Sequence, residues 1–556
     1  MKRTRPIGLA VTILVAIAVL GGLSAARGGL YADRYEGDMM HLVEMVLRMA
    51  DGQWPHLDFM TPIGLFGTWP IAIFVKAGYG FGMAVHLAQI AVALVLAPCV
   101  FWAAFSRFQG VFAHAFAVVV MILTLALVHG EADPNISLSM HYNRWAWAFT
   151  FVALTLAFLP NRGVARPTLD GILIGLALAV VVLIKVTYLV ALAPGIVVAL
   201  AARGAWRPLV TALVAGIVAL GAVTVWQGVA FWPAYIDDLL TVATSDARSN
   251  PGRPLNKVLT APMFLGAHIL TLLAVVLLRQ GGRGPSGLAL LVLFPGLVYV
   301  TFQNFGNDPQ WLLWAGLFVL AVRPATGVKN TWGWEVRPAL GLVAAAMLAL
   351  ISPSLLNMAY SPFRHYATDV TKFVPVFRDE DQHGDFFTFS ERAYQVNMLI
   401  AGERPGGGLE TYRALAEREK RGGSEAVLNG ETFEVCTIQN GLVAWFQTVA
   451  DNLEKAGFAD GTQIMTADLL SALPLFKDGI DFVEGGAPWR YVGVPGIQNA
   501  DYVMVPLCAV NGRSRRWILE EIEARGIALT EVYRDALIIL LKTDNADQTP
   551  AAASTR

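Results

Sequence analysis

Residues 33–64 read DRYEGDMMHLVEMVLRMADGQWPHLDFMTPIG, and they directly follow the first apolar run of the chain. This stretch is too rich in charge to lie in hydrocarbon. Polar side chains recur in it every three or four residues between Leu, Val and Met, at Asp38, His41, Glu44, Arg48 and Asp51. The period predicts an amphipathic helix at a membrane interface, with its apolar face down and Asp38 at the water boundary. The alternative is a solvated juxtamembrane loop whose acids have no chemical role.

The composition is that of a polytopic membrane protein. The chain has 556 residues, of which 55% are hydrophobic and 15% charged, and its mean hydropathy is +0.53. The formal net charge of -1 gives no indication of a nucleic-acid partner. Of the three cysteines, Cys99 falls in an apolar run, whereas Cys436 and Cys508 fall in the polar C-terminal third. A disulfide between the last two is an open possibility.

Apolar runs of about 20 residues, long enough to cross a bilayer, recur along the first two thirds of the chain. We predict about eleven transmembrane helices, at 7–26, 81–104, 111–130, 144–160, 169–186, 188–202, 208–230, 261–279, 285–302, 310–323 and 337–355. Most arginines between them then share one side with the basic N-terminus, which the positive-inside rule places in the cytoplasm. The layout requires residues 63–76 to form an interfacial or re-entrant helix. The pattern of the first run fits a retained helix and a cleaved signal peptide equally, so both stay open at this point.

Beyond Tyr360, charged residues and glycine-rich turns replace the apolar runs. The pattern there predicts helices at 441–457 and 515–525 and strands at 502–507, 527–533 and 536–542. Such alternation is typical of an α/β layered domain. We therefore divide the chain into a transmembrane domain at 1–356, whose external loop 29–80 contains the acidic stretch, an external domain at 357–545 and a disordered tail at 546–556.

An acidic cluster after the first span, a helix and the turn Gly52-Gln-Trp-Pro55-His-Leu-Asp58-Phe59-Met-Thr-Pro62-Ile-Gly64 follow one another in this chain. Together they resemble the first external loop of GT-C-type membrane glycosyltransferases, in particular the bacterial branch related to protein mannosyltransferases and aminoarabinose transferases. The resemblance implies an inverting enzyme of the bacterial inner membrane, with a retained first helix and an external domain in the periplasm. It would take a hexosyl or pentosyl group from a polyprenyl-phosphate donor at the outer face and pass it to a lipid, glycan or protein acceptor.

The chemistry of such a transfer requires a carboxylate that takes the acceptor proton and cations that hold the leaving phosphate. The resemblance places the catalytic acid in the acidic loop, and Asp38 matches that position best. This chain has Glu36-Gly37-Asp38 where relatives have an Asp-Glu doublet. The choice of base among Asp33, Glu36 and Asp38 therefore stays open.

Lys185 is the first candidate for binding the donor, because a charge inside an apolar run costs roughly 3 kcal/mol and usually has a function. The alternative is a lysine near a helix end that reaches water. Residues 183–187 also resemble the family's Leu-x-Lys-x-Thr segment, whose lysine contacts the donor phosphate. Arg144, Asn143 and Asp58 are further donor-binding candidates, although Arg144 also suits an interfacial anchor.

His41, Gln303 and Asn304 are candidates for binding the acceptor or the sugar, because their side chains can hydrogen-bond hydroxyl groups. The two amides suit plain turn residues equally well. We predict no metal site and no cofactor from residue spacing, although two loop carboxylates could share a divalent ion, as in some GT-C relatives.

Two other classes of function stay open. A transporter would place charges near the midplane of paired repeats, whereas here the polar residues concentrate in external loops and no repeat is visible. A sensor or assembly protein would use its external domain to bind a partner. The sequence indicates neither the sugar, nor the acceptor, nor the oligomeric state.

Overall fold

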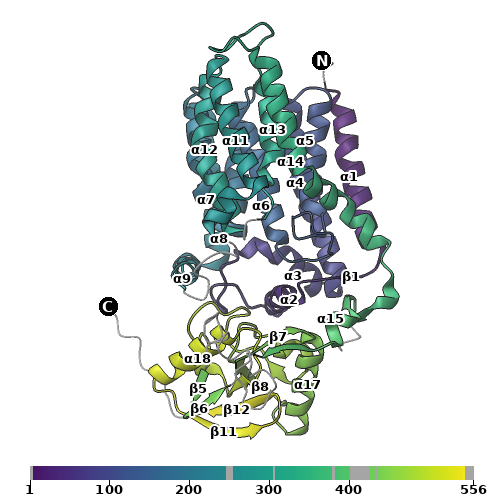
Figure 1. The fold of residues 1–556 in the computed structure, drawn as a ribbon, viewed down its shortest axis with the longest axis vertical. Helices are drawn as coiled ribbons and strands as arrows, with labels where there is room; N and C mark the ends of the chain where they lie inside the picture. Colours follow the sequence, from purple (N-terminus) through teal and green to yellow (C-terminus); the bar gives the residue numbers. More distant parts are fainter. Residues whose placement is uncertain are drawn as a thin grey trace, which may run out of the picture.

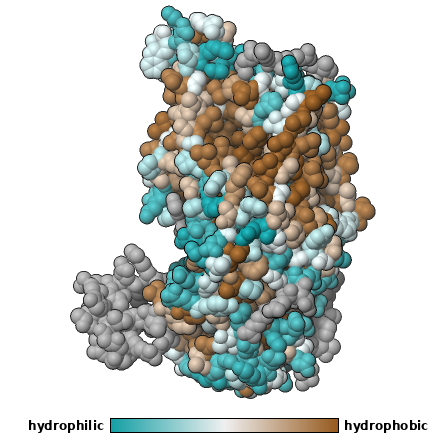
Figure 2. All heavy atoms as spheres, turned by 90° about the vertical axis from the view of Figure 1, so that its right-hand side faces the viewer, coloured by the Kyte–Doolittle hydropathy of each residue, from teal (hydrophilic) through white to brown (hydrophobic). Residues whose placement is uncertain are grey.

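The computed structural model describes residues 4–163, 165–245, 254–304, 307–377, 382–400, 426–433 and 435–544. Long helices form a bundle, and a smaller domain of strands and helices lies against one end of it (Figure 1). Figure 2 shows a broad apolar belt over one face of the bundle and mostly polar side chains over the smaller domain. The predicted disordered tail at 546–556 lies outside the described residues.

Seven helices in the described part of the chain are long and apolar enough to cross a membrane. They are α1 (Pro6–Ala26), α4 (Phe81–Arg107), α7 (Pro167–Ala201), α8 (Trp206–Gln227), α11 (Pro262–Gln280), α12 (Gly284–Gln303) and α14 (Val336–Tyr366). Three further apolar helices are mostly buried among them, namely α5 (Val111–Leu125), α6 (His141–Phe158) and α13 (Trp311–Val322). The prediction of a polytopic helical protein is confirmed.

Helix α7 consists of two antiparallel arms. Its 35 residues are helical except at Lys185, where an extended backbone (φ -160°, ψ 101°) separates the arms. Asp170 near the start of the first arm and Leu200 near the end of the second line one cavity, so the chain reverses at Lys185. The spans predicted at 169–186 and 188–202 are therefore the two arms of a helical hairpin.

Several predicted span boundaries differ from the structure by a few residues or more. The span predicted at 111–130 ends early, because α5 stops at Leu125 and Val128 then pairs with Ile136 in a β-bridge. Helix α6 begins at His141 instead of residue 144, after a left-handed residue at position 140 (φ 58°). Helix α14 continues past the predicted end at residue 355 as far as Tyr366.

The N-terminus lies at the bundle end remote from the smaller domain (Figure 1), and arginines between the spans gather at that end, where Arg107, Arg203 and Arg207 line one cavity. Arg162 donates to the Ala321 carbonyl (2.8 Å) and lies near Arg283. The Gly110 N–H donates to the Thr4 hydroxyl (2.9 Å), which holds the N-terminus there. The one-sided charge layout is therefore present in the structure.

Short helices lie between the bundle and the smaller domain. They are α2 (Glu36–Ala50), the 3-10 turn η1 (Leu65–Gly67), α3 (Trp69–Lys76), α9 (Phe231–Ala243) and α10 (Leu255–Thr260). The 8 residues of α3 span roughly 12 Å, too short to cross a bilayer, as the layout requires for residues 63–76. Helix α2 is the predicted amphipathic helix. However, the prediction of a water-facing polar stripe is wrong for Glu44 and Arg48, because the C-terminal domain covers both side chains.

The C-terminal domain is built on a five-stranded mixed sheet, as the predicted α/β pattern requires. Its strand order is β11 (Leu529–Arg534), β12 (Ile538–Thr543), β10 (Tyr502–Pro506), β8 (Thr462–Thr466) and β9 (Ile480–Asp481). Strand β10 runs parallel to β8 and antiparallel to β12. The predicted helices are α17 (Leu442–Lys455) and α18 (Gly512–Ala524), accompanied by the 3-10 turns η5 (Leu473–Phe476) and η6 (Ile497–Asn499).

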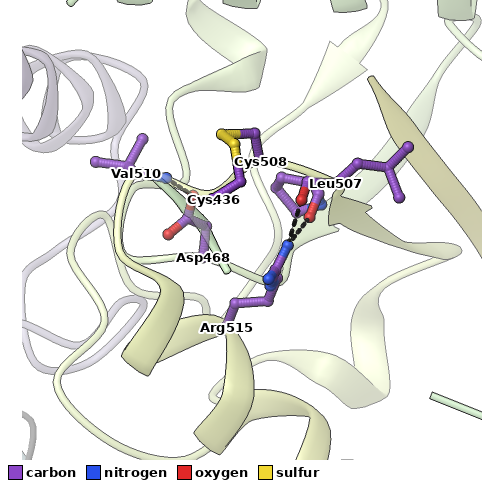
Figure 3. Close-up of a disulfide and its surroundings, with 7 residues drawn as sticks. Cys436, Asp468, Leu507, Cys508, Val510 and Arg515 are labelled. Atoms are coloured by element: carbon purple, nitrogen blue, oxygen red, sulfur yellow. Dashed lines mark hydrogen bonds between the residues drawn. A yellow bond between two sulfur atoms is a disulfide. The ribbon is translucent and has the colours of Figure 1, made fainter. Parts of the chain in front are cut away.

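Small sheets join the two halves of the molecule. The chain between α1 and α2 contributes β1 (Leu30–Ala32), which runs parallel to β3 (Phe386–Phe389), and β3 also pairs with β2 (Phe373–Pro375). The remaining elements are η3 (Val370–Lys372), α15 (Ser390–Tyr394), the pair β4 (Asn397–Ile400) with β7 (Cys436–Asn440), and the pair β5 (Ala426–Leu428) with β6 (Glu431–Phe433). A disulfide between Cys436 and Cys508 joins β7 to the chain after β10 (Figure 3).

Candidate active site

Two groups of predicted site residues lie on either side of the segment 137–143, at the bundle end that the C-terminal domain covers. The acids at the start of α2 lie on one side, where Ser139 contacts Asp38. Lys185, at the tip of the α7 hairpin, lies on the other, where it contacts Asn143. One short segment therefore links the candidate base to the candidate phosphate ligand.

Lys185 is held by amide oxygens. Its ammonium donates to Asn143 Oδ1 (3.0 Å) and to Asn304 Oδ1 (2.7 Å), and it lies 5.6 Å from the centroid of the Tyr142 ring. These acceptors and the ring face stabilise the cation. Lys185, Asn143 and Asn304, selected separately from the sequence, thus form one cluster.

Tyr188 is a member of this cluster that sequence reasoning missed. Its hydroxyl donates to the Asn143 carbonyl (3.2 Å) and accepts from Asn304 Nδ2 (2.8 Å). The two bonds fix the Asn304 amide so that its oxygen faces Lys185. A phenol three residues after a lysine in an apolar run is the signal that could have identified it, because residues i and i+3 are neighbours on a helix.

The turn motif packs directly on the hairpin tip. The Gly64 N–H donates to the Ile184 carbonyl (3.1 Å), and a Cβ atom at Gly64 would clash with the carbonyl of Leu183. Glycine is required here because the two backbones approach too closely for a side chain. The glycine that ends the sequence motif therefore supports the backbone immediately before Lys185.

Asp38 lies in the first turn of α2, half-buried, and accepts a hydrogen bond from the Ser139 hydroxyl (2.9 Å). The other two acids are tied to different partners. Glu36 is buried and accepts from Arg392 through both oxygens (3.1 and 2.9 Å), which fastens α2 to α15. Asp33 accepts from the Ile136 N–H (2.9 Å), and burial raises the pKa of its carboxyl.

Two other donor-binding candidates bond to backbone rather than to the Lys185 cluster. Arg144 is fully buried and donates to the carbonyls of Ala126 and Val128, so it holds the chain that follows α5. Asp58 accepts from the Trp54 N–H (2.6 Å), which closes the turn motif on itself. In the structure both residues shape the loops around the cluster.

The three candidates for binding the acceptor or the sugar lie in different places. The His41 ring lies 5.0 Å from the Trp489 ring in an edge-to-face contact, so it borders the C-terminal domain. Asn304 belongs to the Lys185 cluster, as described above. Gln303 is the half-buried last residue of α12, next to Asn304 in the chain.

The C-terminal domain also reaches the polar side of α2. The Ser471 hydroxyl lies 3.0 Å from both oxygens of Glu44, which also accepts from Arg48 Nε (3.0 Å) and Nη2 (2.9 Å). Burial raises the pKa of the Glu44 carboxyl and lowers that of nearby Arg490 to about 10. This buried group fixes α2, and therefore Asp38, relative to the domain. Sequence reasoning missed its domain residues, because their partners are more than 400 positions away.

Asp468 organises the domain loop beside that group (Figure 3). It is buried and accepts from the backbone N–H groups of Leu469, Val510 and Asn511. Burial raises the pKa of its carboxyl to about 6, although these N–H groups oppose the shift. Two of the donors, Val510 and Asn511, lie two and three residues after Cys508, so the disulfide and Asp468 hold the same stretch after β10.

The chain is similar to two solved structures. No protein-family model matches its sequence, and no curated protein matches it significantly. The crystal structure of ArnT from Cupriavidus metallidurans in the apo state aligns with 96% of this chain and 97% of its own, at 13% identity and a TM-score of 0.38. The cryo-EM structure of the arabinofuranosyltransferase AftD from Mycobacteria aligns with 97% of this chain and 40% of its own, at 12% identity and a TM-score of 0.34. Both TM-scores are below 0.5, so we base no conclusion about activity on either likeness.

Among the described residues, no group of three or more His, Cys, Asp or Glu side chains could hold a metal ion. A cavity of about 370 Å³ lies at the C-terminal end of α2, lined among others by Asp51, Lys76, His383 and Phe482. It mixes acidic, basic and aromatic groups at the junction of the bundle and the C-terminal domain. The arrangement around 137–143 thus combines a carboxylate and a cation at one end of the bundle.

Proposed function

We propose that the chain is an integral-membrane glycosyltransferase that takes a sugar from a polyprenyl-phosphate donor. The acceptor is a lipid, a glycan or a protein, and the reaction takes place at the outer face of the inner membrane. The observation that supports this most is the Lys185 cluster at the hairpin tip. A lysine ammonium and a half-buried carboxylate that contact the same short segment suit transfer away from a phosphate.

In the proposed reaction, Asp38 takes a proton from the acceptor hydroxyl or amine. The acceptor atom attacks the anomeric carbon from the face opposite the phosphate, which inverts its configuration. The bond from that carbon to the phosphate oxygen breaks, and the electron pair leaves with polyprenyl phosphate. Lys185 stabilises the negative charge of this leaving group, and Asn143 and Asn304 keep its ammonium in place.

The proposed outer location is supported by two features. Arginines between the spans gather at the opposite bundle end, which is the cytoplasmic end under the positive-inside rule. The Cys436–Cys508 disulfide suits an oxidising compartment such as the periplasm. The long polyprenyl chain would then lie in the membrane beside the apolar face of the bundle, with its phosphate at the level of the hairpin tip.

The test compares the glycolipids and surface glycans of a strain with and without the gene. We expect one sugar to disappear in the deletion strain and to return with the wild-type gene. Lys185→Ala and Asp38→Asn should not restore it at equal protein levels in the membrane. Lys257→Ala, which changes an exposed lysine in α10, is the matched control and should restore it fully. Unchanged glycans and glycolipids in the deletion strain would contradict the proposal.

A further inference from the structure

A second cavity, of about 240 Å³, lies at the other end of the bundle, between the two arms of α7 and the start of α8. Its polar lining consists of Arg107, Asn161, Asp170, Arg203 and Arg207, with Trp206 beside them. Three guanidinium groups face one carboxylate, so the lining has a net positive charge. The transfer chemistry proposed for the opposite end does not use this cavity.

The cavity wall is preorganised. Arg107 is 1% exposed and donates to Asp170 (2.7 Å), to the Ser106 hydroxyl (2.9 Å) and to the Leu156 carbonyl (3.4 Å). Its Nε atom is buried without a hydrogen-bond partner in the part of the chain that the structure describes. Arg107 is therefore fixed by three acceptors, and its Nε–H is left over as a donor.

The rim of the cavity is also positively charged. Arg203 donates to the Ala157 carbonyl (2.6 Å), and Arg207 is exposed. Helix α8 begins here with no side-chain cap and no acidic residue in its first turn, so its N-terminal N–H groups add to the positive potential. By contrast, the first turn of α7 contains Asp170, whose carboxylate offsets the positive potential of that helix N-terminus.

The position along the membrane normal also favours a lipid. Trp206 is 61% exposed, as interfacial tryptophans commonly are, and one to two helical turns further along α8 the apolar Val210, Leu213 and Val214 are exposed. The cavity therefore opens where the apolar surface ends, at the depth of phospholipid headgroups.

We propose that this cavity binds a phosphate group, carried by an anionic phospholipid of the surrounding leaflet or by a soluble phosphate compound. The guanidinium groups and the α8 N-terminus would share the phosphate oxygens, which matches the planar donor geometry of arginine. The site is independent of the proposed transfer reaction and lies at the opposite end of the bundle.

The test uses the delipidated full-length protein in detergent and two matched double variants. Arg203→Gln with Arg207→Gln removes the rim charges of the cavity. The control, Arg337→Gln with Arg283→Gln, removes two arginines from the same bundle end, and Arg337, like Arg203, donates to one carbonyl. Arg107 is left unchanged, because its loss would leave Asp170 buried without its ion-pair partner.

Native mass spectrometry then measures binding of dioleoyl phosphatidylglycerol against phosphatidylcholine. In parallel, thermal unfolding measures the effect of inorganic phosphate against chloride at equal ionic strength. We expect the rim variant to bind phosphatidylglycerol at least about fivefold less than the control variant, with Arg207→Gln alone in between. Stabilisation by inorganic phosphate that only the rim variant loses would assign the site to a soluble compound instead. Equal loss in the rim and control variants, or no response of the wild type to either probe, would overturn the proposal.

Discussion

At the scale of single residues, Lys185 shows how the fold accommodates a charge that its sequence neighbours disfavour. The apolar run around it would impose a cost of roughly 3 kcal/mol on a lysine in mid-span. The chain avoids most of that cost by reversing direction at Lys185, so the ammonium lies at the end of both arms. Two amide oxygens then replace part of its hydration.

We predict that Lys185→Ala weakens binding of polyprenyl phosphate by the purified protein by about ten- to a hundredfold, because a hydrogen bond to a charged group contributes about 1.5–3 kcal/mol. Isothermal titration in detergent measures the affinity. Lys257→Ala, the exposed-lysine control, should bind as the wild type does. If Lys185→Ala binds polyprenyl phosphate as well as the wild type does, the Lys185 ammonium reaches water and does not bind the phosphate.

We predict that Asp38→Asn lowers the rate of sugar transfer by about 10²–10⁴-fold and leaves donor binding intact, because it removes a general base without changing size. Turnover and donor affinity, measured on the same preparation, separate the two effects.

The neighbouring acids provide the comparison for Asp38. Glu36→Gln weakens the ion pair with Arg392, and Asp33→Asn weakens the acceptor for the Ile136 N–H, so both should lower the melting temperature more than the turnover. A Glu36→Gln enzyme with normal stability and no turnover would show that Glu36, and not Asp38, is the general base.

At the scale of elements, the α7 hairpin and the turn motif form one unit. The motif ends in a glycine whose backbone lies against the residues before Lys185, so the loop after α2 supports the hairpin tip. In addition, α2 is fastened to the C-terminal domain by Glu44 and Ser471. These contacts place three segments that are far apart in sequence around the same site.

We predict that Gly64→Ala reduces turnover by about 10²-fold, because displacing a catalytic group by about 1 Å has an effect of that size. The added methyl group would clash with the Leu183 carbonyl and shift the hairpin tip. Gly221→Ala in α8, where a Cβ would meet nothing within 4 Å, is the matched control and should have normal turnover. Equal activity of the two variants would show that the contact with the turn does not position Lys185.

We predict that Asp468 makes the protein less stable as the pH rises. Its folded-state pKa is raised from 3.8 to about 6, so its contribution to stability is fully present below pH 3.8 and is lost as the pH rises through about 6. Between about pH 4 and pH 7, the melting temperature of Asp468→Asn should therefore fall less than that of the wild type.

Tryptophan fluorescence during heating measures this pH dependence. Asp460→Asn, a change at an exposed carboxylate of the same domain, should follow the wild type. Parallel curves for the wild type and Asp468→Asn would contradict the assignment to Asp468.

At the scale of the whole molecule, the two ends of the bundle differ in chemistry. One end has the basic residues and the arginine-lined cavity, and the other has the candidate active site under the C-terminal domain. A donor anchored in the membrane could reach the hairpin tip, whereas an acceptor from the aqueous side would approach between the bundle and the domain.

We predict that the two ends lie on opposite sides of the membrane. In a Cys99→Ser background, Thr331→Cys should be labelled by an impermeant maleimide only after the cytoplasmic side is opened. Thr530→Cys should be labelled in intact spheroplasts. Both positions are exposed, one at the basic end and one in the C-terminal domain. Labelling of both from the same side would overturn the layout.

The sequence by itself determined the elements of this protein. Hydrophobic runs located the spans and both arms of the α7 hairpin, because about 20 apolar residues are what a bilayer requires. Periodicity located α2 and α17, because it reports which face of a helix is polar.

Only the tertiary structure decided what covers each polar face. Periodicity cannot distinguish water from another domain, so the burial of Glu44 under Ser471 was not predictable from the helix alone. The tertiary structure also decided which groups contact the cations. Lys185 lies among amide oxygens at a chain reversal, whereas Arg144 holds backbone carbonyls. Both are charges in apolar surroundings, and their roles differ because packing brings different acceptors to them from distant parts of the chain.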